Sequence, residues 1–245
     1  MKYIEIDLGI KLKEDIKYYN LSEKISQGIN KYFLYNEELT TFHEENKFKF
    51  YNFSLLTPIE KDKLYKKNKT YNLTLRFFNK EILNSFYESL LKIENSIFSV
   101  VNRNFRIIEQ KEKIKYLETI TPCVITLKKK NINEPLRYLD VTTYDKKSVL
   151  NYLNGNSLKK YRNLIEDIDT QYNFIEDVEI LNKKSIIFSY KKGIIIGNKF
   201  KLKIKDDELS QKIAFLTLGS GLSEKNSLSY GFCKEYYKEK LIWEI

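Results

Sequence analysis

The same order of strand and helix patterns occurs twice along this chain, and that repetition limits the possible fold more than any other feature. Residues 2–10 alternate between polar and apolar side chains, as a half-buried strand does. Apolar side chains then recur at helical spacing over residues 21–33, and either Asn20 or Ser22 can cap that helix. The chain is therefore predicted to begin with one strand followed by one helix.

Two further strands, a helix and a last strand are predicted to complete the first half. β-branched and aromatic residues are concentrated at 48–56 and 70–78, which predicts two strands joined by the lysine-rich loop 61–69. A helical pattern begins at Asn79, and residues 97–111 again have the composition of a strand. This β-α-β-β-α-β order is that of a ferredoxin-like unit.

The second half repeats this order after the charged segment 111–115, which we interpret as a linker. It is predicted to begin with a strand over 116–128 and a helix that Asp145 caps, which Gly155 and Asn156 break before a second helical stretch. Strands are predicted over 174–181, 185–191 and 194–205. A helix from Asp206 or Asp207 to Gly219 and closing strands from about 229 to 245 complete this half. No close sequence repeat accompanies this order. The predicted fold class is therefore α+β, with two tandem ferredoxin-like domains that comprise residues 1–115 and 116–245.

The charge of the chain points to a polyanionic partner. The formal net charge is +10 at pH 7, and the isoelectric point is near 9.2. Lysines that neutralise phosphates release counterions, which strengthens binding at low salt and makes nucleic acid the leading partner. An AT-rich genome also encodes lysine-rich proteins, so the charge alone leaves both explanations open.

A few residue types limit the cofactors and the location. The chain has two cysteines, Cys123 and Cys233, which are too few for a disulfide framework, and with one histidine they cannot form a conventional zinc cluster. The first residues have a strand pattern rather than that of a signal sequence, and no apolar run reaches membrane-spanning length. We therefore expect a reduced, cytoplasmic protein with no metal, no cofactor and no membrane partner.

The single histidine is the first candidate for chemistry. His43 ends a helical segment, six residues before Lys49 on the predicted strand, so the two side chains can meet at one edge of the first domain. RNA cleavage by its own 2′-hydroxyl needs a base, an acid and positive charge at the phosphorane. Tyr32 and Tyr35 on the preceding helix are available as a third group. Without context, however, a single histidine is more often a packed or surface residue.

The second candidate is the segment 218–232, which contains three of the chain's eight glycines directly after a predicted helix. Glycines there let backbone N–H groups approach a phosphate closely, and Lys225 and Asn226 add charge and hydrogen-bonding groups. The segment is not a Walker loop, because it follows the helix rather than preceding it and lacks the lysine and hydroxyl residue of that motif. A helix end that leads into a hairpin explains the same residues.

Together these segments resemble the CRISPR-associated endoribonucleases that process precursor CRISPR RNA, a group within the RAMP superfamily. The resemblance spans the whole chain. The residues that carry it are Gln27-Gly28, His43-Glu44 with Lys49, residues 51–55, residues 119–122 before a predicted strand, and the glycine-rich segment from Gly219 and Gly221 through residues 224–228 to Gly231 and Phe232. The glycine-rich segment matches the signature of the superfamily and is the most specific of these.

The resemblance implies tandem ferredoxin-like domains and metal-independent cleavage within each CRISPR repeat, which leaves a 2′,3′-cyclic phosphate and a 5′-hydroxyl. It implies His43 as general acid or base and Lys49 as the cation that stabilises the pentavalent phosphate. Where some members use a catalytic tyrosine on the first helix, this chain has Lys31, so Tyr32 is the available substitute, with Tyr35 and Lys31 as the alternatives. The implied RNA-binding residues are Gly219, Gly221, Lys225, Asn226, Ser227 and Gly231.

The resemblance has departures and alternatives. The loop is slightly longer than the compact family pattern, and Ser229 stands where a glycine is usual. The expected partners are CRISPR repeat RNA in precursor crRNA and other Cas subunits of an interference complex, and the enzyme is expected to act as a monomer or homodimer. The alternatives are a non-catalytic RAMP subunit that binds guide RNA, and a general RNA-binding or scaffold protein whose histidine is incidental.

Overall fold

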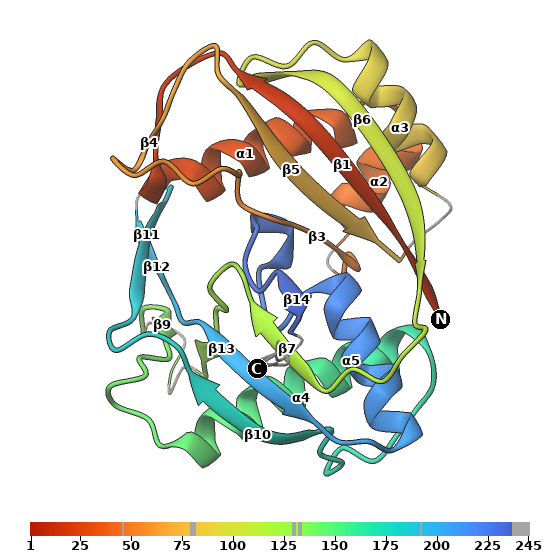
Figure 1. The fold of residues 1–245 in the computed structure, drawn as a ribbon, viewed down its shortest axis with the longest axis vertical. Helices are drawn as coiled ribbons and strands as arrows, with labels where there is room; N and C mark the ends of the chain where they lie inside the picture. The colour runs from red at the N-terminus through yellow and green to blue at the C-terminus, as the bar shows by residue number, and fades with distance from the viewer. Residues whose placement is uncertain (46, 79–81, 129–130, 132–133, 192, 237–245) are drawn as a thin grey trace, which may run out of the picture.

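Two four-stranded antiparallel sheets, one in each half of the chain, organise the fold (Figure 1). The computed structural model describes residues 1–245 except 46, 79–81, 129–130, 132–133, 192 and 237–245. The first half contains β1 (Lys2–Leu12), β2 (Ile16–Lys17), α1 (Tyr18–Phe33), α2 (Glu37–Glu44), β3 (Tyr51–Phe53), β4 (Leu64–Tyr65), β5 (Thr70–Phe77), α3 (Leu83–Lys92) and β6 (Phe98–Glu109). The second half contains β7 (Tyr116–Thr119), β8 (Thr126–Leu127), β9 (Arg137–Tyr138), α4 (Lys146–Leu164), β10 (Ile175–Ile180), β11 (Ile186–Tyr190), β12 (Gly193–Gly197), β13 (Phe200–Ile204), α5 (Glu208–Ser220), the 3₁₀ turn η1 (Asn226–Leu228) and β14 (Cys233–Glu235).

The two sheets have the same topology. The first has the strand order β3-β5-β1-β6, and the second has the order β10-β13-β7-β14. When the sheet strands are numbered along each half, both orders read 2-3-1-4, with helices after the first and third strands. The predicted α+β class with two tandem ferredoxin-like domains is therefore confirmed.

Helix α1 begins earlier than predicted because the residues before it are paired. Strand β2 pairs with β4, and the Tyr18 N–H donates to Lys63 O at 2.9 Å, which fixes the start of the helix. The helix has no side-chain cap. Asn20 and Ser22, predicted as caps, lie inside its first two turns. The segment predicted as the loop 61–69 contains β4.

The strand predicted over 48–56 is shorter, and this changes the position of Lys49. Phe50 has a φ of 47°, in the left-handed region, which interrupts an extended strand. Strand β3 therefore covers Tyr51–Phe53, and Lys49 lies in the connection between α2 and β3 rather than on a strand. The helix start predicted at Asn79 lies outside the described residues.

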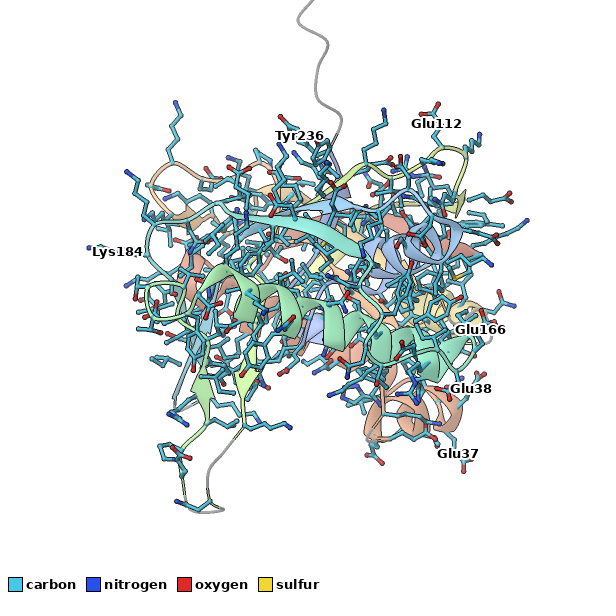
Figure 2. The ribbon with its side chains drawn as sticks, turned by 90° about the horizontal axis from the view of Figure 1, so that it is seen from below. Glu37, Glu38, Glu112, Glu166, Lys184 and Tyr236 are labelled. Carbon is cyan, nitrogen blue, oxygen red and sulfur yellow. The ribbon has the colours of Figure 1, made fainter. Side chains whose placement is uncertain are left out.

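Two elements of the second half also differ from the prediction. Helix α4 continues through Gly155 and Asn156, because a glycine in a helix costs about 1 kcal/mol, less than burial of Leu153 and Leu158 provides. Seen from below the view of Figure 1, α4 spans the width of this half (Figure 2). The strand predicted over 116–128 divides into β7 and β8, because the residues between them bridge to other segments.

Helix α5 begins as predicted and ends later. Asp207 caps it and Asp145 caps α4, and each carboxylate accepts a hydrogen bond from the N–H three residues later. Helix α5 passes through Gly219 and ends at Ser220, and Gly221 is its C-cap with a φ of 88°. The helix end predicted at Gly219 is therefore wrong by one residue.

Each sheet has its own hydrophobic core. One cluster of buried side chains extends from Ile4 to Phe98, and the other lies almost entirely between Ile114 and Cys233. The predicted division after residue 115 falls between the end of β6 and the start of β7. The domain boundary itself stays a prediction. Of the predicted closing strands, β14 is described and 237–245 lie outside the described residues. No helix in the described part of the chain is both long and apolar enough to cross a membrane.

The two halves contact each other at several points. Arg76 on β5 is 8% exposed, and its guanidinium donates to Glu5 Oε2 at 2.6 Å, to Leu218 O at 2.8 Å and to Cys233 O at 2.6 Å. The β11–β12 hairpin of the second half reaches the start of α1 (Figure 1). These contacts place the glycine-rich segment against the first half.

Candidate active site

His43 lies in the last turn of α2, with one face of its ring covered. Asn36 caps this helix and accepts a hydrogen bond from the Leu39 N–H at 2.9 Å. The imidazole stacks on Phe33, with ring centroids 5.7 Å apart and an angle of 8° between the planes. Within the described residues, no protein group forms a hydrogen bond with either ring nitrogen. Both nitrogens of the half-buried ring are therefore available to a substrate.

The surroundings of His43 favour its neutral form. Partial burial lowers the pKa of the imidazole below its usual value of 6.5, and the nearby Lys49 ammonium lowers this pKa further. The Glu44 carboxylate acts in the opposite direction. At neutral pH the imidazole is therefore uncharged in most molecules and can accept a proton.

Lys49 is held at the same end of α2. Its Nζ donates to Phe42 O and, at 2.5 Å, to Glu45 O, so the ammonium satisfies carbonyl groups at the end of the helix. Burial lowers the pKa of Lys49, and the Glu45 carboxylate opposes this shift. The structure thus brings His43 and Lys49 together, although their catalytic roles stay predictions.

The three candidates for a third catalytic group point elsewhere. Tyr32 is buried in the core, with its ring centroid 6.1 Å from that of Phe98, and burial raises its pKa. The Tyr35 hydroxyl accepts a hydrogen bond from the Lys92 ammonium of α3 at 2.8 Å. Lys31 donates to Ser96 Oγ, before β6, at 2.6 Å. This arrangement gives no support to any of the three as a group that contacts RNA beside Lys49.

The three glycines of segment 218–232 permit close packing. A Cβ on Gly219 would overlap the rings of Phe78 and Tyr3, so this glycine lets α5 approach the first half. Gly221 and Gly231 have φ values of 88° and 69°, which favour glycine. A Cβ on Gly231 would also overlap the carbonyl oxygen of the residue that follows Gly221. All three glycines therefore shape the segment.

Asn226 stabilises the glycine-rich segment from within. Its side chain is buried, and Nδ2 donates to Leu222 O at 3.1 Å and to Tyr230 O at 2.8 Å. Its Oδ1 accepts a hydrogen bond from the Lys160 ammonium at 2.6 Å. Ser229, predicted to occupy a usual glycine position, has a φ of 68°, which explains why glycine suits that position.

A pocket of about 280 Å³ lies between the segment 47–51 and the glycine-rich segment. It contains Lys47 and Lys49 from the first half and Lys225, Asn226 and Ser227 from the second. Helix α4 contributes Asn156 and Lys160. His43 does not line this pocket but lies on the helix whose end Lys49 holds. The structure therefore joins the two segments that the sequence singled out.

Sequence reasoning missed the contribution of α4. Lys160 follows Leu153 and Ser157 at helical spacing on a buried helix face, and a lysine at such a position is a signal of function. The signal was hidden because the helix was predicted to break at Gly155.

An adjoining cavity of about 640 Å³ is rich in phenylalanine side chains, from Phe42, Phe48, Phe50 and Phe78.

The fold and the site together define a class of protein. The class is a protein of two ferredoxin-like domains, with a glycine-rich segment of the second that closes a lysine-lined pocket against the first. The family described as "CRISPR associated protein Cas6, C-terminal" matches residues 106–235, more than half of the chain. The chain therefore belongs to the Cas6 family.

Individual relatives extend the similarity along the chain. A protein of Methanocaldococcus jannaschii named CRISPR-associated endoribonuclease Cas6 2 is 25% identical over 242 residues, which cover 94% of this chain and 98% of that protein. A solved structure described as CRISPR associated protein Cas6 has a TM-score of 0.71 at 20% identity, and covers 96% of this chain and 100% of its own. Another, described as an RAMP protein binding different RNA substrates, has a TM-score of 0.68 at 19% identity, with coverages of 97% and 100%. The solved structures establish a shared fold.

Proposed function

We propose that this chain is an endoribonuclease that cleaves CRISPR repeat RNA in precursor crRNA and releases guide RNAs. The observation that carries this proposal is the placement of His43 and Lys49 at one end of α2, beside the pocket that the glycine-rich segment closes. The name of the M. jannaschii relative, an endoribonuclease, supports the activity. The description of an RNA-binding RAMP structure supports RNA as the ligand.

The proposed reaction is a metal-independent transesterification. Neutral His43 accepts the proton of a 2′-hydroxyl, and that oxygen attacks the adjacent phosphorus. The bond from phosphorus to the 5′-oxygen breaks, and this oxygen leaves with a proton from the imidazolium or from water. The products are a 2′,3′-cyclic phosphate and a 5′-hydroxyl. Lys49 stabilises the charge on the pentavalent phosphate, because its ammonium has a third donor beyond the two used on carbonyl groups.

The glycine-rich segment is proposed to bind RNA in two ways. Lys225 and Ser227 line the pocket, where they can contact a phosphate or a ribose directly. Asn226 and the glycines Gly219, Gly221 and Gly231 act indirectly, since they fix the path of the segment. The phenylalanines of the adjoining cavity offer faces for stacking of unpaired bases.

Incubation of the purified protein with its repeat RNA in the presence of EDTA tests the proposal. The wild-type protein is expected to cut each repeat once and leave a cyclic phosphate, identified by mass spectrometry. His43→Ala should lower the cleavage rate about 100-fold or more while RNA binding persists. His43→Gln is the matched control for packing, since it keeps a planar polar group on Phe33 but cannot titrate, and it should be equally slow.

Other outcomes would change the assignment. RNA binding without cleavage by the wild-type protein would identify a non-catalytic subunit that binds guide RNA. Cleavage that EDTA abolishes would contradict the metal-independent mechanism. Full activity of His43→Ala and His43→Gln would remove the imidazole from the reaction.

A further inference from the structure

Lys160 is a buried lysine that lacks a carboxylate partner. It lies on α4 with 3% of its surface exposed. Its Nζ donates to Gly221 O and to Asn226 Oδ1, both at 2.6 Å, and both acceptors are neutral oxygens. No carboxylate in the described part of the chain forms an ion pair with this ammonium. A buried charge without a counter-charge is costly, so the site favours an anion.

The other groups that face Lys160 compensate its charge only in part. The thiols of Cys123 and Cys233 act on it, but burial raises the pKa of Cys123 well above its usual value and that of Cys233 to about 12. Both thiols are therefore neutral near pH 7. The Glu224 carboxylate, which also lines the pocket, raises the pKa of Lys160 from beyond ion-pair distance, but burial outweighs it. Three further ammonium groups, those of Lys47, Lys49 and Lys225, line the same pocket.

The geometry leaves one donor of Lys160 for a ligand. An ammonium donates up to three hydrogen bonds, and the protein accepts two from Lys160. Lys160 lines the pocket of about 280 Å³. We propose that Lys160 binds a phosphate group of the RNA in this pocket, behind the glycine-rich segment. This inference rests on the proposed binding of repeat RNA but not on the cleavage chemistry.

A phosphate at Lys160 couples RNA binding to pH. Burial lowers the pKa of Lys160 to about 7 in the free protein, and a phosphate binds the charged form. RNA affinity should therefore fall as pH rises above about 7. The stability of the folded protein changes in the opposite direction, because the unfolded chain, with an ordinary lysine pKa of about 10.4, binds more protons across this range. The contribution of Lys160 to stability and its contribution to RNA affinity therefore have opposite pH dependences.

The experiment measures binding of a repeat RNA oligonucleotide in a His43→Ala background, which removes the chain's one histidine and the proposed cleavage. Lys160→Met keeps the apolar stem and removes the charge. It should lower RNA affinity roughly 10- to 100-fold at about pH 6.5. The slope of log K against log salt should become shallower by about 0.7, which is one phosphate contact on a single strand. Between about pH 6.5 and 8.5 the RNA affinity of the His43→Ala parent should fall roughly tenfold. The variant that also carries Lys160→Met should not show this loss.

Lys199→Met is the matched control. Burial lowers the pKa of Lys199 too, but this lysine does not line the pocket, so its removal should leave the affinity and the salt slope unchanged. Parental affinity, slope and pH profile in Lys160→Met would overturn the proposal. If Lys160→Met does not fold, the pH profile of the His43→Ala parent serves as the test. A parental RNA affinity that is constant over this pH range also overturns the proposal. Binding by a wild-type protein that never cleaves would overturn the nuclease assignment and leave this inference in place.

Discussion

The imidazole of His43 has three neighbours that set its protonation. The ring of Phe33 covers one face and removes water, and the Lys49 ammonium repels an added proton. Glu44, in the same helical turn, attracts a proton and partly opposes both effects. Since burial and the ammonium prevail, the pKa of His43 is lowered, which favours the neutral form that the proposed base requires.

The pH dependence of cleavage tests this base. If neutral His43 is required, the single-turnover rate should rise with pH on a limb whose midpoint lies below 6.5, because the pKa is lowered. Glu44→Gln should move the midpoint to still lower pH, since it removes the charge that raises the pKa. Glu37→Gln, whose side chain projects outward at the start of α2 (Figure 2), should leave the midpoint unchanged. A rate that falls with rising pH through this region would instead identify His43 as the acid.

Lys49 holds the end of α2 and has a proposed electrostatic role at the phosphate, and stability and kinetics of one variant test the two separately. Lys49→Met removes two hydrogen bonds to carbonyl groups at the end of α2, which should cost about 1–3 kcal/mol of stability. It should also slow cleavage more than it weakens RNA binding, because a cation at the phosphorane acts mainly in the transition state. Lys47→Met is the control, because it removes another ammonium from the same pocket, one that pairs with the Glu45 carboxylate near the surface. Unaltered cleavage in Lys49→Met would exclude Lys49 from the mechanism.

At the scale of elements, the glycine-rich segment depends on backbone conformations that other residues adopt poorly. Gly231→Ala should destabilise the protein by about 2–4 kcal/mol, because φ is 69° and a Cβ would overlap Leu222 O. Gly155→Ala on α4 is a control of opposite sign, since apart from the adjacent backbone of its own helix nothing lies within 4 Å of its Cβ position. That substitution should stabilise the protein by about 0.5–1 kcal/mol. Urea denaturation of both variants measures these changes, and equal effects would contradict the assigned conformations.

The order of elements could be predicted from the sequence, whereas several boundaries could not, because they depend on distant contacts. Periodicity gave the four strands of the first sheet and the helices between them. It could not locate the start of α1, which a hydrogen bond from Tyr18 to Lys63 fixes. It also could not show that Phe50 leaves the extended region and so releases Lys49 from the strand. Similarly, Lys160 gains its significance from Gly221 and Asn226, which are more than 60 residues away in the sequence.

At the scale of the whole molecule, one buried arginine connects the two sheets. Arg76 binds Glu5 within the first sheet, and its remaining hydrogen bonds reach backbone carbonyls of the second half. Its guanidinium also lies 4.2 Å from the ring centroid of Phe232. Burial alone would raise the pKa of Glu5, but Arg76 and Arg106 outweigh it and lower that pKa. This ion pair therefore stabilises the protein above pH 4.5, and the contribution is lost as pH falls further.

Removal of Arg76 should weaken the contact between the domains more than either domain. Arg76→Leu leaves two carbonyl groups without a donor and part of the Glu5 charge uncompensated, which should cost about 3–5 kcal/mol. Because each sheet has its own core, thermal unfolding should change from one transition to two, and RNA affinity should fall since the pocket lies between the domains. Arg103→Leu is the control, because Arg103 contacts Tyr87 within the first half. If Arg76→Leu still unfolds in one transition with wild-type RNA affinity, Arg76 is not what holds the pocket together.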